Sequence, residues 1–171
     1  MQRVFVYGTL LPHQHNHHLL ANARALGAAQ TLSLFRMFDT GRGYPGVKVA
    51  GNDSGFDKTE VVPGGYPIIG AVYDVDARHM ATLDVLEGYR EEGGGLYDRR
   101  RVPVAALTDT GSEGAGGEAW IYTFNGDTRF MAEILSGDWR SWSAGLRTSE
   151  GRGAPLRHGC ALVFLSDMYR D

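Results

Sequence analysis

A short apolar segment that ends in a glycine turn constrains the fold of this chain most strongly. Residues 4–10 read Val-Phe-Val-Tyr-Gly-Thr-Leu, and the β-branched and aromatic side chains among them predict a buried strand. Gly8 is expected to free the backbone for a turn, and Asn16 followed by the Leu/Ala-rich residues 18–26 predicts a helix. A strand, a glycine turn and a helix can expose backbone N–H groups to an anion, but they also fit a core strand with an ordinary turn.

Residues 76–88 predict a second helix, which has one buried face. Asp76 is a suitable N-cap, the apolar residues at positions 80, 83 and 86 follow helical spacing, and Gly88 ends the pattern. The helix therefore places Glu87 in its last turn, beside the apolar face.

The position of Glu87 is unusual for a carboxylate. The negative end of the helix dipole opposes ionisation, so the pKa of the Glu87 carboxyl is expected to rise. A carboxylate of this kind suits a general base. Alternatively, Glu87 leans into solvent or pairs with Arg90 or Arg99.

Further elements follow from periodicity and from turn residues. Strands are predicted at 29–39, 47–50, 68–75, 97–107 and 119–124, with turns or loops at 40–46, 91–96 and 111–117. Residues 51–65 look like a surface insertion, 130–142 a short helix and closing turn, 143–154 a linker, and 160–165 a strand or short helix. Arg99, Arg100 and Arg101 are expected to form a solvated or salt-bridged edge.

Length and composition limit the classes of protein that this chain can represent. Its 171 residues fit one domain, and 43% hydrophobic with 22% charged residues is ordinary for a globular protein. The net charge of −3 argues against a nucleic-acid surface, and no apolar run approaches the ~20 residues of a membrane span. Cys160 is the single cysteine and the N-terminus lacks a signal-peptide pattern, so we expect a cytoplasmic protein without a disulfide framework.

Four histidines stand among residues 13–18 and raise the question of a metal site. No acidic residue or cysteine stands near them in the sequence. A solvated loop is therefore the favoured interpretation, and no metal ligand is assigned.

Three motifs in this order resemble the γ-glutamylcyclotransferase superfamily, in its AIG2-like branch. They are Val-Tyr-Gly-Thr-Leu at residues 6–10, Leu-Asp-x-Leu-Glu-Gly at 83–88 and Tyr-x-Arg-x-x-Val at 97–102. Gly126-Asp127 and Gly-Asp-Trp-Arg at 137–140 resemble the tail of bacterial members. The resemblance implies an α+β fold, a small mixed β-barrel flanked by helices, over residues 1–142. Residues 143–171 would then form a linker and C-terminal extension.

The resemblance also implies a reaction and its site. In this family the α-amine of a γ-glutamyl compound attacks the γ-carbonyl of the same molecule and 5-oxoproline is released. Glu87 matches the catalytic glutamate, and no cofactor or metal is required. The implied substrate-binding residues are Tyr7, Gly8, Thr9, Leu10, Pro45 and Tyr97.

The loop sequence Tyr-Gly-Thr-Leu differs from the Tyr-Gly-Ser-Asn of the glutathione-pathway branch. This difference favours γ-glutamyl amines over free γ-glutamyl amino acids as substrates. The expected partner is thus a small molecule, with no nucleic acid or membrane, and the oligomeric state stays open. Two alternatives remain: a non-catalytic small-molecule binding domain of the same fold, or an amide hydrolase or lyase in which Glu87 activates water.

Overall fold

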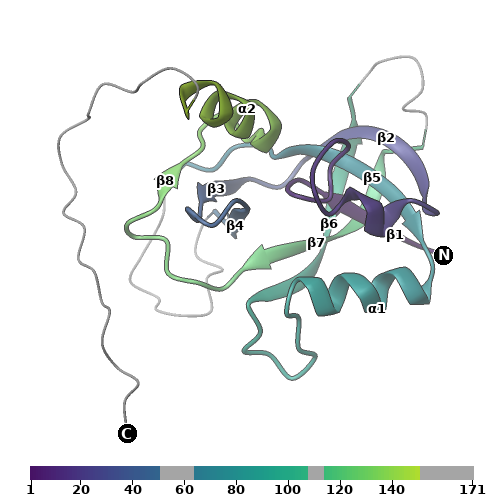
Figure 1. Cartoon of the computed structure of the whole chain (residues 1–171). Coiled ribbons are helices and arrows are strands. Elements are labelled where there is room, and N and C mark those ends of the chain that lie inside the picture. Colours follow the sequence, from purple (N-terminus) through teal and green to yellow (C-terminus); the bar gives the residue numbers. More distant parts are fainter. Residues whose placement is uncertain (51–63, 108–113, 151–171) are drawn as a thin grey trace, which may run out of the picture.

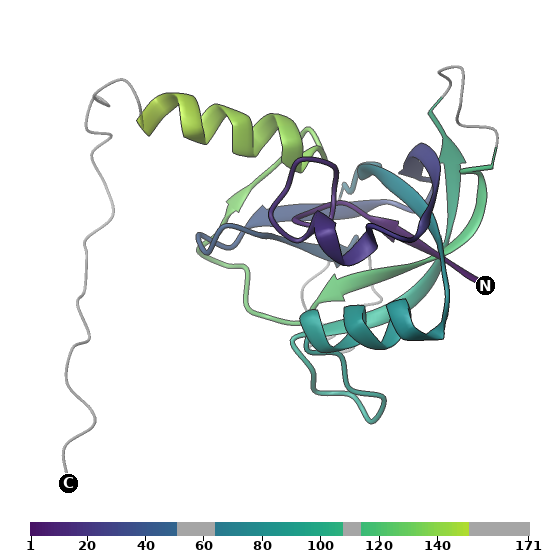
Figure 2. The same cartoon turned by 45° about the vertical axis from the view of Figure 1, so that its right-hand side comes forward.

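A closed five-stranded barrel forms the centre of the molecule (Figures 1 and 2). The computed structural model describes residues 1–50, 64–107 and 114–150. Around the barrel the strands follow the order β1-β5-β2-β6-β7; β7 closes on β1 in parallel, and the other neighbours are antiparallel. This arrangement confirms the predicted mixed barrel. The barrel strands are β1 (Gln2–Val6), β2 (Arg24–Thr31), β5 (Ile69–Val75), β6 (Tyr97–Ala106) and β7 (Gly117–Phe124).

A small second sheet and two helices complete the described fold. The sheet has the order β4-β3-β8, from β4 (Pro45–Val49), β3 (Phe35–Asp39) and β8 (Ala132–Glu133). Helices α1 (Ala77–Leu86) and α2 (Trp139–Glu150) lie on opposite sides of the molecule in both views (Figures 1 and 2). No helix in the described ranges is long and apolar enough to cross a membrane.

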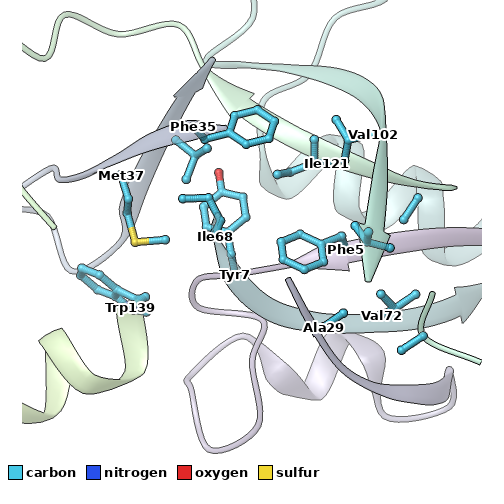
Figure 3. Close-up of a cluster of buried hydrophobic side chains, with 14 of the residues drawn as sticks. Phe5, Tyr7, Ala29, Phe35, Met37, Ile68, Val72, Val102, Ile121 and Trp139 are labelled. Carbon is cyan, nitrogen blue, oxygen red and sulfur yellow. The ribbon is translucent and has the colours of Figure 1, made fainter. Parts of the chain in front are cut away.

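Strand β1 is buried on both faces, as the sequence predicts. Phe5 belongs to a cluster that fills the barrel and continues to the small sheet and α2, whereas Val4 and Val6 pack in a second cluster with α1. Figure 3 shows the first cluster, with Phe5 and Val72 at one end and Met37 and Trp139 at the other. The alternation follows from the period of two in a strand. β1 therefore lies between the barrel interior and the helix that carries Glu87.

The helix predicted at 18–26 is wrong. Only η1 (His17–Leu20) is helical, as a 3₁₀ turn, and β2 begins at Arg24. β2 pairs with both β5 and β6 and buries Leu26 in the barrel, so tertiary pairing overrides the helix propensity of its Leu and Ala residues. At Gly27 the pairing register shifts and φ is +125°, a conformation that residues other than glycine resist. Asn16 stands at the N-cap position of η1 without a side-chain cap bond.

The single strand predicted at 29–39 is two strands. β2 ends at Thr31 and β3 begins at Phe35. The buried Thr31 hydroxyl donates to the Ser33 carbonyl over 2.8 Å and accepts from the Ile68 amide over 2.9 Å. These bonds stabilise the turn between the two strands. The predicted strands at 47–50, 68–75, 97–107 and 119–124 and the helix at 76–88 are confirmed, with shifted ends.

The C-terminal helix starts later and runs further than predicted. Asp138 accepts from the amide of Arg140 at 3.0 Å and from the hydroxyl of Ser141 at 2.7 Å, which starts α2 near Trp139. The predicted linker from residue 143 is therefore helical as far as Glu150. The division into a domain and an extension at residue 142 stays a prediction. Residues 51–63 of the predicted insertion, 111–113 of the predicted loop and 160–165 lie outside the described residues.

Ile134 and Leu135, which lie between β8 and α2, test the described packing of this part of the chain. Ile134→Ala should lower the free energy of unfolding by about 2–5 kcal/mol, because Ile134 is only 1% exposed in the barrel cluster. Its neighbour Leu135 is 73% exposed, so Leu135→Ala should change stability by less than about 0.5 kcal/mol. Urea unfolding of both variants measures the difference; equal effects would contradict the described burial.

Candidate active site

A cavity of about 210 Å³ opens where the loop after β1 meets the end of α1 and the starts of β4 and β6. The structure brings all seven residues predicted from the sequence into its lining: Tyr7, Gly8, Thr9, Leu10, Pro45, Glu87 and Tyr97. Sequence reasoning missed the other lining residues, which are Phe5, Val6, His15, Asn16, Tyr44, Leu86, Leu96 and Tyr122. Val6 and Leu86 belong to the motifs at 6–10 and 83–88, and Tyr44 stands in the predicted turn at 40–46 beside Pro45, so these residues carried a signal, whereas Tyr122 carried none.

The loop after β1 is held in place by Asn16. The Asn16 amide donates to the Thr9 carbonyl at 3.0 Å, and Asn16 Nδ2 donates to Thr9 Oγ1 at 3.0 Å. Leu11 closes the turn by donating to the Gly8 carbonyl at 3.1 Å. Within the described part of the chain, no carbonyl or side chain accepts from the N–H groups of Gly8, Thr9 or Leu10. Three free backbone donors in a cavity lining suit an anionic group.

Gly8 is required for a reason that the sequence did not predict. Its φ lies outside the left-handed region, so the expectation that the turn needs a special backbone angle is wrong. A Cβ at Gly8 would instead lie 2.9 Å from Pro45 Cγ and 3.0 Å from Pro45 Cδ. Gly8 therefore lets the loop lie directly against the first residue of β4.

Glu87 is the C-cap residue of α1, and Gly88 follows it with a φ of +60°. No described group donates a hydrogen bond to the Glu87 carboxyl, and no ion pair among the described residues includes Glu87 or Arg90. Arg99 pairs with Asp84 instead, so the predicted alternative of a Glu87–Arg99 pair is not found.

Burial raises the pKa of the Glu87 carboxyl to about 7. The predicted direction is thus confirmed, but the cause is desolvation of the carboxylate, where the sequence suggested the helix dipole. A carboxyl that titrates near neutral pH can both accept and return a proton.

Two buried phenols face Glu87 across the cavity. The Tyr7 hydroxyl donates to the Tyr122 carbonyl at 2.7 Å, and the Tyr97 hydroxyl donates to the Pro45 carbonyl at 2.9 Å. Burial raises the pKa of both hydroxyls, and the charge of Glu87 adds to the effect, so both phenols stay neutral. Each hydroxyl proton is donated to a carbonyl, so the oxygens can accept from a bound donor, although the Tyr7 oxygen already accepts from the backbone N–H of Val47.

The histidines of residues 13–18 do not converge. His17 Nδ1 lies 3.0 Å from the Leu10 carbonyl, and His18 Nδ1 lies 2.9 Å from the His15 carbonyl. His15 alone among them lines the cavity. Among the residues that the structure describes, no group of three or more His, Cys, Asp or Glu side chains is arranged to hold a metal ion.

Comparisons with known proteins agree with this fold. The family model described as gamma-glutamyl cyclotransferase, AIG2-like, matches residues 4–141, which include every residue lining the cavity. A relative from Vibrio cholerae is 35% identical over 136 residues, 80% of this chain and 93% of the relative. The gamma-L-glutamyl-butirosin B gamma-glutamyl cyclotransferase of Niallia circulans is 28% identical over 144 residues, 83% of this chain and 78% of that protein. An AIG2-like protein from Mus musculus shares the fold, with a TM-score of 0.60 at 22% identity over 79% of this chain and 86% of that one.

The raised pKa of Glu87 predicts a pH-dependent effect of Glu87→Gln on stability. The folded protein binds this proton more tightly than the unfolded chain, so the stability from this group is complete below about pH 4.5 and falls as pH rises to about 7. The variant lacks this loss, so its stability relative to wild type should increase by up to about 3 kcal/mol between pH 4.5 and pH 8. Urea unfolding at both pH values measures this. Glu118→Gln, which alters an exposed carboxylate of β7, should show no such increase.

The contact between Gly8 and Pro45 predicts a double-mutant coupling. Gly8→Ala should destabilise the protein by about 1–3 kcal/mol because the added Cβ overlaps the proline ring. In a Pro45→Ala background Cγ and Cδ are absent, so the same change should cost much less. Thermal unfolding of the two single variants and the double variant gives the coupling; additive effects would contradict the close contact.

Proposed function

The chain belongs to the AIG2-like gamma-glutamyl cyclotransferase family, and on this basis we propose that it releases 5-oxoproline from a γ-glutamyl amine or related γ-glutamyl amide. The observation that carries the proposal is the position of Glu87, whose buried carboxyl, with a pKa of about 7, lines the same cavity as the free N–H groups of residues 8–10.

Glu87 is the general base and then the general acid of the proposed reaction. The substrate's α-ammonium loses a proton to Glu87, and the free amine attacks the γ-carbonyl of the same molecule. A C–N bond to the α-nitrogen forms, and Glu87 returns the proton to the leaving amine as the bond to that amine breaks. The ring nitrogen then loses its second proton to the Glu87 carboxylate, which passes it to the departing amine or to solvent, so that 5-oxoproline keeps one N–H. A pKa close to the working pH suits both steps.

The loop and the two phenols have complementary roles in binding. The N–H groups of Gly8, Thr9 and Leu10 stabilise negative charge on the substrate, either its α-carboxylate or the oxyanion that develops on the γ-carbonyl. The hydroxyl oxygens of Tyr7 and Tyr97 accept hydrogen bonds from the α-ammonium. Pro45 supports this arrangement through its contact with Gly8 and its bond to Tyr97.

Ring closure within one molecule explains why the site needs no nucleophilic side chain. Holding the γ-glutamyl arm folded removes much of the entropic part of the barrier. The proposed choice of a γ-glutamyl amine rests on the Thr-Leu pair at residues 9–10 of the loop. It is consistent with the relative from Niallia circulans, whose name describes a γ-glutamyl derivative of butirosin.

A screen of γ-glutamyl amines for 5-oxoproline, with Glu87→Gln beside the wild type, tests the proposal. The wild type should release 5-oxoproline from at least one amine, and Glu87→Gln should lower kcat by about 10²–10⁴-fold, because an amide cannot accept the α-ammonium proton. The fold should be retained, since the change removes an unpaired buried charge.

Product analysis defines the outcomes that would contradict the proposal. Release of free glutamate would indicate that Glu87 activates water, and no product from any γ-glutamyl amine would favour a binding domain. Full turnover by a folded Glu87→Gln variant would remove Glu87 from the mechanism.

A further inference from the structure

A partly buried ionic network anchors the end of helix α1 to the barrel. Asp84, one turn before Glu87, accepts hydrogen bonds from the Tyr122 hydroxyl at 2.6 Å and from Arg99 Nη1 at 2.9 and 2.8 Å. The side chains of Asp84 and Arg99 are only 24% and 20% exposed. The network therefore joins α1 to strands β6 and β7 behind the cavity wall.

Arg99 is itself held by two aromatic rings. Its guanidinium carbon lies 4.6 Å from the ring centroid of Tyr89 and 5.0 Å from that of Trp120. Such cation–π contacts restrict the guanidinium to one orientation. Asp84 thus binds a cation whose position is set by β7 on one side and by the residue two positions after Glu87 on the other.

The main chain of Asp84 closes the turn that contains Glu87. The Tyr89 amide donates to the Asp84 carbonyl at 2.9 Å, and the Gly88 amide donates to the Val85 carbonyl at 3.2 Å. With Gly88 in the left-handed conformation, these two bonds form a Schellman motif in which Glu87 is the C-cap. Glu87 lies inside a closed loop that Asp84 holds with its backbone and ties to the barrel with its side chain.

Tyr122 connects the same network to the opposite cavity wall. Its hydroxyl donates to Asp84, and its carbonyl accepts from the Tyr7 hydroxyl at 2.7 Å. A displacement of Asp84 would consequently shift both the Glu87 carboxyl and the Tyr7 hydroxyl.

We propose that Asp84, Arg99 and Tyr122 are positioning residues, which hold the Glu87 carboxyl at the depth and angle needed for proton transfer. The proposal rests on the function proposed above for Glu87. None of the three transfers a proton in the reaction. Loss of the network should lower kcat by about 10–100-fold, because a small misplacement of a general base is costly, while KM changes little since the loop donors remain.

A second triad of tyrosine, arginine and carboxylate, with a glutamate in place of the aspartate, provides a control. The Tyr66 hydroxyl donates to Glu133 at 3.2 Å, and Glu133 is paired with Arg36. Arg36 and Glu133 belong to the small sheet, Tyr66 bridges to its strand β3, and none of the three lines the cavity. Asp84→Asn and Tyr122→Phe are therefore compared with Glu133→Gln and Tyr66→Phe. Tyr122→Phe removes one hydroxyl and leaves the ion pair, which protects the test against a variant that fails to fold.

Two measurements test the positioning role. In steady-state kinetics, Asp84→Asn and Tyr122→Phe should lower kcat with KM within about threefold of wild type, whereas both control variants should match wild type. In ¹³C NMR titrations of glutamate-labelled protein without substrate, the Glu87 pKa should fall by about one pH unit or more in the two network variants, because a released turn hydrates the carboxyl, and stay unchanged in the controls.

Wild-type kcat and an unaltered Glu87 titration in folded Tyr122→Phe and Asp84→Asn would overturn the positioning role. If the wild type releases no 5-oxoproline, the proposed function fails by itself. The positioning proposal is then decided by the Glu87 titration alone, which requires no turnover.

Discussion

Closure of the barrel by β1 is the constraint on which the rest of this structure depends. β1 pairs antiparallel with β5 along its whole length and parallel with β7 at Val4, which joins the first strand of the barrel to the last. Because both faces of β1 are buried, its exit direction is determined, and residues 7–10 leave it directly into the cavity. Because the barrel closes in this way, β7 lies beside α1. The N–H groups of residues 8–10 and the Glu87 carboxyl therefore line the same cavity.

Two carboxylates one turn apart on α1 have opposite environments. Asp84 faces Arg99 and Tyr122 and is compensated by both, whereas Glu87 lines a cavity that includes no lysine or arginine among its described lining residues. The compensation of Arg99 by Asp84 leaves Glu87 unpaired, and desolvation then raises the pKa of its carboxyl. The ion pair behind the cavity wall therefore contributes to leaving the Glu87 carboxyl unpaired.

The cavity contains several features that a protein avoids elsewhere. A desolvated carboxyl without a protein donor and three N–H groups without a protein acceptor line one cavity, and groups of this kind cost stability compared with groups that are paired within the protein. The surrounding structure is well determined: Asn16 holds the loop, Pro45 contacts Gly8, and a Schellman motif closes the turn at Glu87. Unpaired polar groups that reduce stability, held by a well-ordered surrounding structure, are typical of binding and catalytic sites.

Local patterns in the sequence determined strands β1, β4, β5, β6 and β7, the helix before Gly88 and the motifs that carry the family resemblance, because each depends on residues close along the chain. Tertiary structure decided the rest. Residues 24–31 became a strand since β5 and β6 offered pairing partners, Gly8 is needed because Pro45 lies against it, and Glu87 titrates high because distant residues exclude water from it. The bonds Tyr7–Tyr122 and Asp84–Tyr122 join residues 115 and 38 positions apart, and no local pattern encodes such contacts.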